Sequence, residues 1–441
     1  MKKILIIGAG RSSGSLITYL LTNAASNNWF ITVTDMNLAL ATEKVKGYSN
    51  CEAKTFDVNN DAQRKAIIEA HDVIVSMLPA TMHGSVAKDC VSFGKHLFTA
   101  SYVSAEMKEL DREAKQKGVL LMNEIGLDPG IDHASAMKII HDLQAKGANI
   151  MSFRSYCGGL VAPESNDNPW GYKFSWNPRN VVVAGQSAAQ YISDGKLKFI
   201  PPSRIFTQID TISVEKYGAF DAYANRDSIS YQEPYGLKNI KTLLRGTLRM
   251  LGYCEAWNVF VRLGLTDDTY KIHEADKLTY TQLLDSVLPP SKGTIKERLK
   301  DFLGKEYNSA IEEKLNYLEL FNDKKIKLKE ASPAQLLQDL LEEKWKLKQG
   351  DKDMIVMQHL FDYELNGKTH NLTSSLVVLG DDENHTAMAK TVGLPLAITL
   401  KNFLDGKFKL SGVQIPIIKD VYIPLLQELE SLGIKFDEKE N

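Results

Sequence analysis

The residues best suited to binding a small charged molecule are gathered between positions 123 and 176. This stretch reads NEIGLDPGIDH from residue 123, YCGG at 156–159 and NPWGYKFSW at 168–176. Glycines let a ligand approach the backbone, charged side chains pair with ionised groups, and aromatic rings form apolar walls. A segment that only packs would not need this mixture. The stretch therefore predicts a pocket for a zwitterionic metabolite.

Several motifs in and around this stretch resemble the glutamate-forming saccharopine dehydrogenases, also called saccharopine reductases. The resemblance is carried by LDPGIDH, SYCGG and YKFSW, and it is extended by SYVS at 101–104, NRDS at 225–228, RGTLR at 245–249 and TAMAKTVGLP at 386–395. It covers nearly the whole chain and is weakest between about residues 267 and 350. It implies an NAD(P)-dependent oxidoreductase of lysine metabolism that interconverts saccharopine with 2-aminoadipate 6-semialdehyde and L-glutamate.

The resemblance also implies a set of residues that line the saccharopine pocket. They are Ser101, Tyr102, Asp128, Cys157, Gly158 and Gly159. We predict Tyr102, Asp128 and Cys157 as the catalytic group, because a tyrosine hydroxyl can donate or carry a proton and a carboxylate can pair with an amine. Each has a plainer interpretation. Asp-Pro-Gly is a turn signal, a buried cysteine is usually a small apolar residue, and a strand-end tyrosine is often a wall.

Arg226 is the best candidate for clamping a carboxylate of the substrate, because a guanidinium binds carboxylates with two parallel hydrogen bonds. The alternative is an ion pair with Asp227 or Glu233. Trp176 is predicted to form a wall of the pocket together with Tyr172, and core packing is its alternative.

The start of the chain predicts a dinucleotide site. Residues 8–14, GAGRSSG, follow a short apolar strand and open a helix, which is where a pyrophosphate meets helix N-terminal amides. Ser13 occupies the third glycine position of the usual fingerprint and Gly14 comes one residue later, so a tight turn without a nucleotide is the alternative. The predicted cofactor-binding residues are Gly8, Gly10, Arg11, Ser12, Ser13, Asp35, Asp57, Val58, Leu78 and Pro79.

Asp35 ends the second predicted strand, where a carboxylate can accept hydrogen bonds from both ribose hydroxyls and would repel a 2′-phosphate. No arginine follows it, so the sequence favours NAD over NADP, with a helix-capping role for Asp35 as the alternative. Asp57 and Val58 are predicted to border the adenine, or else to form a turn. Residues 76–79 are expected on the nicotinamide side. His83 follows them as a possible proton carrier, although a helix cap or a substrate contact is more usual.

The predicted fold class is α/β. Short apolar strands at 2–7, 29–34, 71–77, 96–100 and 118–123 alternate with helical patterns, which indicates a Rossmann-like doubly wound parallel sheet. Longer strands at 151–157, 204–214 and 354–365 suggest a mixed sheet in a substrate domain.

Leucine and isoleucine spacing predicts that residues 243–349 form a helical insert. Arg245 and Arg249 then lie four apart on a helix, reaching either the substrate or a domain interface. The predicted domains are 1–127 plus about 385–420 for the dinucleotide, 128–242 plus about 350–384 for substrate and dimerisation, and 243–349 as the helical domain.

The composition excludes several classes of protein. The chain has 53 basic and 55 acidic residues and a formal charge of -2, which gives no electrostatic footprint for nucleic acid or an anionic membrane. The four cysteines have no CxxC spacing and no accompanying histidine cluster, so no metal site is predicted. The first apolar run is too short for a secretory signal, and no segment reaches the ~20 apolar residues of a membrane helix. We expect a cytoplasmic homodimer.

Two other functions stay open at this stage. A polyamine-pathway relative such as carboxynorspermidine synthase performs the same reductive imine chemistry on a diamine, although Arg226 and the YKFSW segment favour a substrate with several carboxylates. A non-catalytic dinucleotide-binding sensor is the second alternative.

Overall fold

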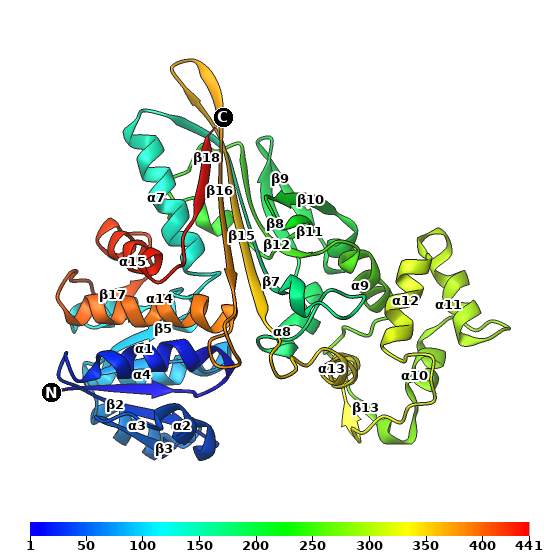
Figure 1. Cartoon of the computed structure of the whole chain (residues 1–441), viewed down its shortest axis with the longest axis horizontal. Helices are drawn as coiled ribbons and strands as arrows, with labels where there is room; N and C mark the ends of the chain where they lie inside the picture. The colour runs from blue at the N-terminus through cyan, green and yellow to red at the C-terminus, as the bar shows by residue number, and fades with distance from the viewer. Residues whose placement is uncertain (441) are drawn as a thin grey trace. The chain divides into compact units, whose positions relative to one another are not determined.

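The computed structural model describes residues 1–440 and divides into two compact units (Figure 1). The first unit comprises Met1–Asn149, Leu365–Lys368 and Leu376–Asp437. The second comprises Ile150–Glu364, Thr369–Ser375 and the C-terminal segment from residue 438. The predicted division into three domains is not tested by this grouping and stays a prediction.

The first unit is built on a parallel sheet of seven strands in the order β17-β6-β5-β4-β1-β2-β3. The strands are β1 (Lys2–Ile7), β2 (Trp29–Asp35), β3 (Cys51–Thr55), β4 (Val73–Ser76), β5 (His96–Thr99), β6 (Leu120–Met122) and β17 (Gly412–Gln414). Central strands are apolar at nearly every position because both faces of a parallel sheet are covered by helices. Ile4, Leu5 and Ile6 are accordingly fully buried. The predicted doubly wound sheet is confirmed.

Helices connect these strands and cover the sheet. They are α1 (Gly14–Ala24), α2 (Leu38–Val45), α3 (Asp61–Glu69), α4 (His83–Phe93), α5 (Ala105–Glu109), α6 (Asp111–Gln116), α7 (Ile131–Ala145), α14 (Ala387–Leu404) and α15 (Lys419–Ser431). Helix α14 runs beside α1 (Figure 1). A Cβ on Gly393 would stand 2.8 Å from the backbone nitrogen of Leu16, so a glycine at 393 is required for this close approach.

The second unit contains a mixed sheet in the order β10-β11-β12-β7-β15-β16-β18, with β8 and β9 attached to β12. Its strands are β7 (Asn149–Val161), β8 (Ala189–Ser193), β9 (Lys196–Ile200), β10 (Ile209–Val214), β11 (Gly218–Ala224), β12 (Thr242–Met250), β15 (Asp353–Leu365), β16 (Lys368–Leu379) and β18 (Asp437–Glu440). Strand β12 pairs in parallel with β7 and antiparallel with β11. The mixed sheet is therefore confirmed.

Two local predictions in this unit are wrong. The predicted strand at 204–214 begins as a short 3-10 helix, Pro202–Thr207, because Pro202 at its first position has a fixed φ that suits a helical turn. The predicted helical region begins too early, since residues 242–250 form strand β12 and helices begin only at Tyr253. This strand is buried on both faces, so its apolar residues do not alternate. Periodicity alone cannot distinguish such a strand from a buried helix. The helices that follow are α9 (Tyr253–Arg262), α10 (Tyr280–Val287), α11 (Ile295–Leu303), α12 (Ser309–Tyr317) and α13 (Pro333–Lys344).

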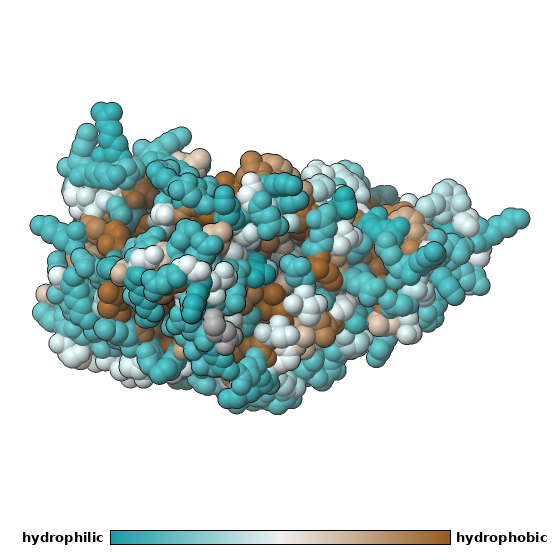
Figure 2. Space-filling view, turned by 90° about the horizontal axis from the view of Figure 1, so that it is seen from above, coloured by the Kyte–Doolittle hydropathy of each residue, from teal (hydrophilic) through white to brown (hydrophobic). Residues whose placement is uncertain are grey.

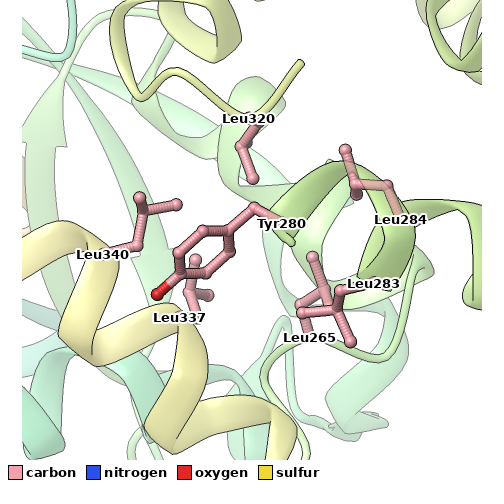
Figure 3. A pocket seen from close by; sticks show the side chains of 7 residues that line it. All are labelled: Leu265, Tyr280, Leu283, Leu284, Leu320, Leu337 and Leu340. Atoms are coloured by element: carbon pink, nitrogen blue, oxygen red, sulfur yellow. The ribbon is translucent and has the colours of Figure 1, made fainter. Parts of the chain in front are cut away.

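A small hollow lies among these helices and is lined almost wholly by leucines around the ring of Tyr280 (Figure 3). Its lining residues are Leu265, Tyr280, Leu283, Leu284, Leu320, Leu337 and Leu340. Because no charged group faces it, it offers nothing to a substrate with several carboxylates.

The surface is in keeping with the nearly balanced charge. The face drawn in Figure 2 is mostly hydrophilic, with hydrophobic residues in scattered patches. Across residues 1–440, no helix has the length and apolar character needed to span a membrane.

Candidate active site

The order of strands in the first unit reverses between β1 and β4, and ligands of open α/β sheets bind at such a reversal. The loops after these two strands lie against each other. The Met77 N–H donates to Ile7 O across 2.8 Å, and the Gly8 N–H donates to Thr34 O across 2.8 Å. Gly8 has φ +105°, and a Cβ there would stand 3.1 Å from the Met77 carbonyl oxygen. A glycine is therefore required at position 8 by the conformation and packing of the backbone, whether or not a cofactor is bound.

Gly10 differs from Gly8, because it has an ordinary φ of -72° and a Cβ there would meet no atom within 4 Å. Gly10 and Arg11 are exposed, Ser12 is half-buried, and Ser13 is buried with its hydroxyl donating to Gly10 O at 2.8 Å. The loop thus leaves open space beside backbone amides at the start of α1. This arrangement suits a pyrophosphate, so the residues present fit a dinucleotide.

Asp35 fastens this loop. Its Oδ2 accepts a hydrogen bond from the Ala9 N–H at 2.9 Å, and its Oδ1 accepts one from the Asn37 N–H at 2.9 Å. Both carboxylate oxygens therefore already have backbone partners. Asn37, and not Asp35, caps α2 through its side chain.

The residues predicted near the adenine and the nicotinamide have mixed surroundings. Asp57 Oδ1 accepts from the Asn59 N–H at 2.9 Å, which is a turn contact, and Val58 belongs to the apolar core of the first unit. Leu78 is half-buried and Pro79 is exposed after β4. The cofactor roles of these four residues stay predictions.

His83 is buried at the start of α4 in a network of hydroxyls. Its Nδ1 lies 2.9 Å from Ser76 Oγ, and its Nε2 lies 2.8 Å from Ser101 Oγ and 3.3 Å from Thr99 Oγ1. Burial lowers the pKa of His83 to about 4. A neutral imidazole bridges Ser76 to the predicted substrate residue Ser101 at neutral pH.

Tyr102 and Asp128 meet at the carboxyl ends of β5 and β6. The Tyr102 hydroxyl donates to Asp128 Oδ1 at 3.2 Å, and both side chains are half-buried. Asp128 stands at the tip of a loop that is closed by the Gly126 N–H donating to Pro129 O at 2.9 Å, and the Asp128–Pro129 peptide is cis. Gly126 and Gly130 pack back to back in this loop, so that a side chain at Gly130 would collide with the Gly126 backbone.

Sequence reasoning missed Glu124, the residue that joins these two segments. It is 4% exposed and has a left-handed φ of 55°. Its signal in the sequence is a charged residue two positions after the buried strand β6, at the same sheet edge as Tyr102.

In the second unit, Cys157 and Gly158 lie within β7, not at its end. Cys157 is 7% exposed and pairs with Thr247 of β12. A Cβ on Gly158 would stand 2.7 Å from Leu248 O, so this glycine is needed for the contact between β7 and β12. Gly159, the next residue, is half-buried. The substrate roles of all three stay predictions.

The YKFSW segment is held by a buried ion pair. The Lys173 ammonium lies 2.7 Å from Asp351 Oδ2 and 2.8 Å from Asp167 Oδ1, with a side chain that is 1% exposed. The half-buried Trp176 donates from Nε1 to the Tyr172 hydroxyl at 3.3 Å. Trp176 thus touches Tyr172, which is 1% exposed, and its role as a pocket wall stays a prediction beside core packing.

The prediction that Arg245 and Arg249 lie on a helix is wrong, since both belong to β12. Arg249 is buried, and its guanidinium faces the rings of three tyrosines, with Tyr172 at 5.3 Å from the ring centroid. Arg245 stacks over Tyr231 at 4.4 Å. The misassignment arose because residues four apart share a face on a strand as well as on a helix.

Arg226 follows β11 with φ 49° and an exposed side chain. Asp227 and Glu233, the alternative partners, have contacts of their own, and both the clamp role of Arg226 and the alternative ion pair stay predictions. Asp227 Oδ1 accepts from the Ile229 N–H at 2.8 Å, and Glu233 lies 3.5 Å from the Lys238 ammonium.

The structure therefore brings together Ser101, Tyr102 and Asp128 in the first unit, at the same sheet edge as the glycine loop. The remaining predicted substrate residues belong to the second unit: Cys157, Gly158, Gly159, Trp176 and Arg226. Among residues 1–440, no group of three or more histidine, cysteine, aspartate or glutamate side chains could hold a metal ion.

Two family models match the chain. Residues 4–122 match the saccharopine dehydrogenase NADP binding domain, and residues 126–434 match the saccharopine dehydrogenase C-terminal domain. The chain is 35% identical to the NADP(+)-dependent, L-glutamate-forming saccharopine dehydrogenase of Pyricularia oryzae, over 99% of both chains. It is 37% identical to the mitochondrial alpha-aminoadipic semialdehyde synthase of Mus musculus, over 99% of this chain and 47% of that protein.

A solved structure agrees with these matches. The apo saccharopine dehydrogenase (L-Glu forming) of Saccharomyces cerevisiae covers 100% of both chains with a TM-score of 0.89 and 33% identity.

The predicted preference for NAD over NADP is wrong by this comparison. The matching domain is described as NADP binding, and the fungal relatives are named for NADP(+). The prediction took the Asp35 carboxylate as available to ribose hydroxyls, whereas in the structure both of its oxygens accept backbone N–H groups. The Asp35 carboxylate therefore stabilises the loop, and its presence does not indicate whether NAD or NADP is preferred.

The two family models together account for nearly the whole chain, and relatives more than 30% identical align with it from end to end. The chain belongs to the saccharopine dehydrogenase family.

Proposed function

We propose that this protein is an NADP-dependent saccharopine dehydrogenase of lysine metabolism that interconverts saccharopine with 2-aminoadipate 6-semialdehyde and L-glutamate. The observation that carries the proposal is the Tyr102–Asp128 pair, which lies at the same sheet edge as the glycine loop. A carboxylate and a hydroxyl at this edge are suited to holding a substrate amine. The names of the full-length fungal relatives support the same reaction.

The nicotinamide cofactor, when bound, takes up the hydride that leaves the carbon next to the substrate's secondary amine. Water then adds to the resulting imine, and the carbon–nitrogen bond breaks to give the aldehyde and the amino group of glutamate. Asp128 is proposed to pair with the secondary amine, and Tyr102 to orient that carboxylate through its hydroxyl. We propose Cys157, Ser101, Gly158 and Gly159 as further contacts, with Trp176 as a wall and Arg226 as a carboxylate clamp.

NADP carries a 2′-phosphate that needs a cation. Two basic residues near the start of α1 are candidates. Arg11 is exposed in the loop, and the half-buried Lys44 places its ammonium 3.4 Å from where a Cβ of Gly14 would be. The Lys44 ammonium also donates to Asn384 Oδ1 at 2.6 Å, which holds it beside the loop.

The decisive experiment follows the absorbance of reduced nicotinamide with saccharopine and NADP, then with NAD, and then with carboxynorspermidine in place of saccharopine. We expect turnover of saccharopine, with a higher kcat/KM for NADP than for NAD. Turnover of carboxynorspermidine alone would favour the polyamine enzyme. Cofactor binding without any turnover would favour a sensor.

The proposal extends to a cytoplasmic homodimer. Within residues 1–440 none of the four cysteines forms a disulfide, which suits a reducing compartment. Strand β9 exposes Leu197 at 58% and Phe199 at 65%, and neighbouring exposed apolar residues often mark contact surfaces. Light scattering would measure the mass in solution, and a monomer at micromolar concentration would contradict the dimer.

A further inference from the structure

We infer that Glu124 is a positioning residue that fixes Tyr102 against Asp128. This inference rests on the proposed function, because it concerns how the proposed catalytic pair is held. Glu124 lies in the stretch 123–176 that predicts the pocket, but it was not among the residues predicted for the site.

Glu124 is hydrogen-bonded to the residues on both sides of Tyr102. Its backbone N–H donates to Ser101 O at 3.1 Å, and its Oε1 accepts from the Val103 N–H at 2.9 Å. Ser101 and Val103 are the residues immediately before and after Tyr102. The peptide planes that flank Tyr102 are thus tied to one residue, which restricts the directions its ring can take.

The same glutamate is anchored to the elements that carry Asp128. Its Oε2 lies 2.8 Å from Nε2 of His133, a fully buried residue in the first turn of α7. The loop with Asp128 at its tip runs between Glu124 and α7, and Ile131 at the start of α7 donates its N–H to Gly126 O at 2.8 Å. Glu124 therefore links the segment of Tyr102 to both ends of the segment of Asp128.

The burial and backbone of Glu124 favour a specific role. A buried carboxylate is costly unless it is hydrogen-bonded, and here both oxygens have partners. A φ of 55° is uncommon for a glutamate and persists only where surrounding contacts hold it. Glu124 contacts the residues on both sides of Tyr102 and the first turn of α7, so we assign it to positioning.

The test compares three variants. Glu124→Asp keeps the charge and is well tolerated at a left-handed φ, but it withdraws the carboxylate by one methylene from Val103 and His133. Glu124→Gln keeps the length and can keep both hydrogen bonds. Glu109→Gln, at an exposed site on the neighbouring α5, is the matched control.

We expect Glu124→Asp to lower kcat by roughly 10- to 100-fold, because small misplacements of a catalytic group have effects of this size. Glu124→Gln and Glu109→Gln should stay within about threefold of the parent enzyme. In a Tyr102→Phe background the effect of Glu124→Asp should shrink to less than about threefold, because the residue acts through Tyr102. Equal damage from Asp and Gln, or an undiminished effect in the Tyr102→Phe background, would overturn the inference.

A second measurement needs no substrate. Hydrogen exchange of the amides at 101–104 should be faster in Glu124→Asp than in the parent, with exchange in β1 and β2 unchanged. If the parent enzyme does not oxidise saccharopine, the proposed function is wrong. The hydrogen-exchange rates at 101–104 then still test whether Glu124 holds this segment. Unchanged exchange at 101–104 would show that Glu124 does not hold the segment.

Discussion

The hydroxyl of Tyr102 donates to Oδ1 of Asp128 across 3.2 Å, joining residues that lie 26 positions apart. The contact follows from topology, since β5 and β6 are parallel neighbours and Tyr102 and Asp128 lie in the segments that follow them. The carboxyl ends of adjacent parallel strands meet at one sheet edge, where α/β enzymes build their sites. This hydrogen bond thereby joins the motif that contains Tyr102 to the motif that contains Asp128.

Because Tyr102 and Asp128 share this bond, their substitutions should not be additive. Tyr102→Phe and Asp128→Asn are each expected to lower kcat/KM for saccharopine by roughly 10- to 100-fold, and the double variant by little more than the worse single one. Steady-state kinetics of the four enzymes completes the cycle. Effects that multiply would show independent roles. A loss above about a thousandfold for one variant would identify an indispensable acid–base.

The parallel sheet was predictable because its strands are short, apolar and separated by helical patterns. Prediction failed at Arg245 and Arg249, whose strand β12 has the same spacing as a helix face. It also failed at Asp35, whose partners Ala9 and Asn37 are backbone groups. Side-chain types show which chemistry is possible, but the local backbone decides which groups are already engaged.

Glu124 illustrates the same limit. Its importance depends on a left-handed φ and on contacts with Val103 and His133, and none of these appears in a motif. The sequence could place a charged residue at the end of β6. It could not show that this residue contacts Val103 and His133.

Arg226 is expected to serve the substrate and not the cofactor. Arg226→Ala should raise the KM for saccharopine and leave the Kd for NADP nearly unchanged, because a carboxylate of the substrate would lose its charged hydrogen-bond partner. The exposed side chain predicts little change in Tm. A KM that changes by less than about threefold would place Arg226 outside the site. Lys238→Ala, at another exposed base in the same unit, is the control.

His83 should make the protein sensitive to acid. Its pKa is lowered by burial from 6.5 to about 4 in the folded state, so the unfolded chain binds the proton more readily. Stability is then complete above pH 6.5 and is lost as the pH falls from 6.5 towards 4, by at most on the order of 3 kcal/mol. Urea unfolding at pH 7.5 and pH 5 should show a smaller loss in His83→Gln than in the parent. An equal loss would show that other groups, such as the buried His71, dominate.

Asp35 should act on cofactor binding through the loop. Asp35→Ala removes the acceptor of the Ala9 and Asn37 N–H groups, so we expect the Tm to fall and the Kd for NADP to rise about tenfold or more. Calorimetric titration measures the Kd, and Glu43→Ala, at an exposed site on α2, is the control. An unchanged Tm together with tighter NADP binding would mean that the carboxylate only repels the phosphate.

The two glycines at the start of the loop allow ligand contact to be separated from backbone requirement. Gly8 has φ +105° and is crowded by Met77, so Gly8→Ala should destabilise the fold by about 1–3 kcal/mol whether or not a cofactor is present.

Gly10 has an ordinary φ of -72° and free space where its Cβ would stand. Gly10→Ala should therefore leave the Tm of the free protein within about 1 °C of the parent, since an alanine there neither strains the backbone nor meets a neighbour. If the pyrophosphate approaches the backbone at Gly10, the added methyl occupies that space, and the Kd for NADP should rise by at least about tenfold. Thermal unfolding with and without NADP measures both effects, because the cofactor should stabilise Gly10→Ala less than it stabilises the parent. If NADP raises the Tm of Gly10→Ala as much as it raises that of the parent, the cofactor does not pass beside this residue.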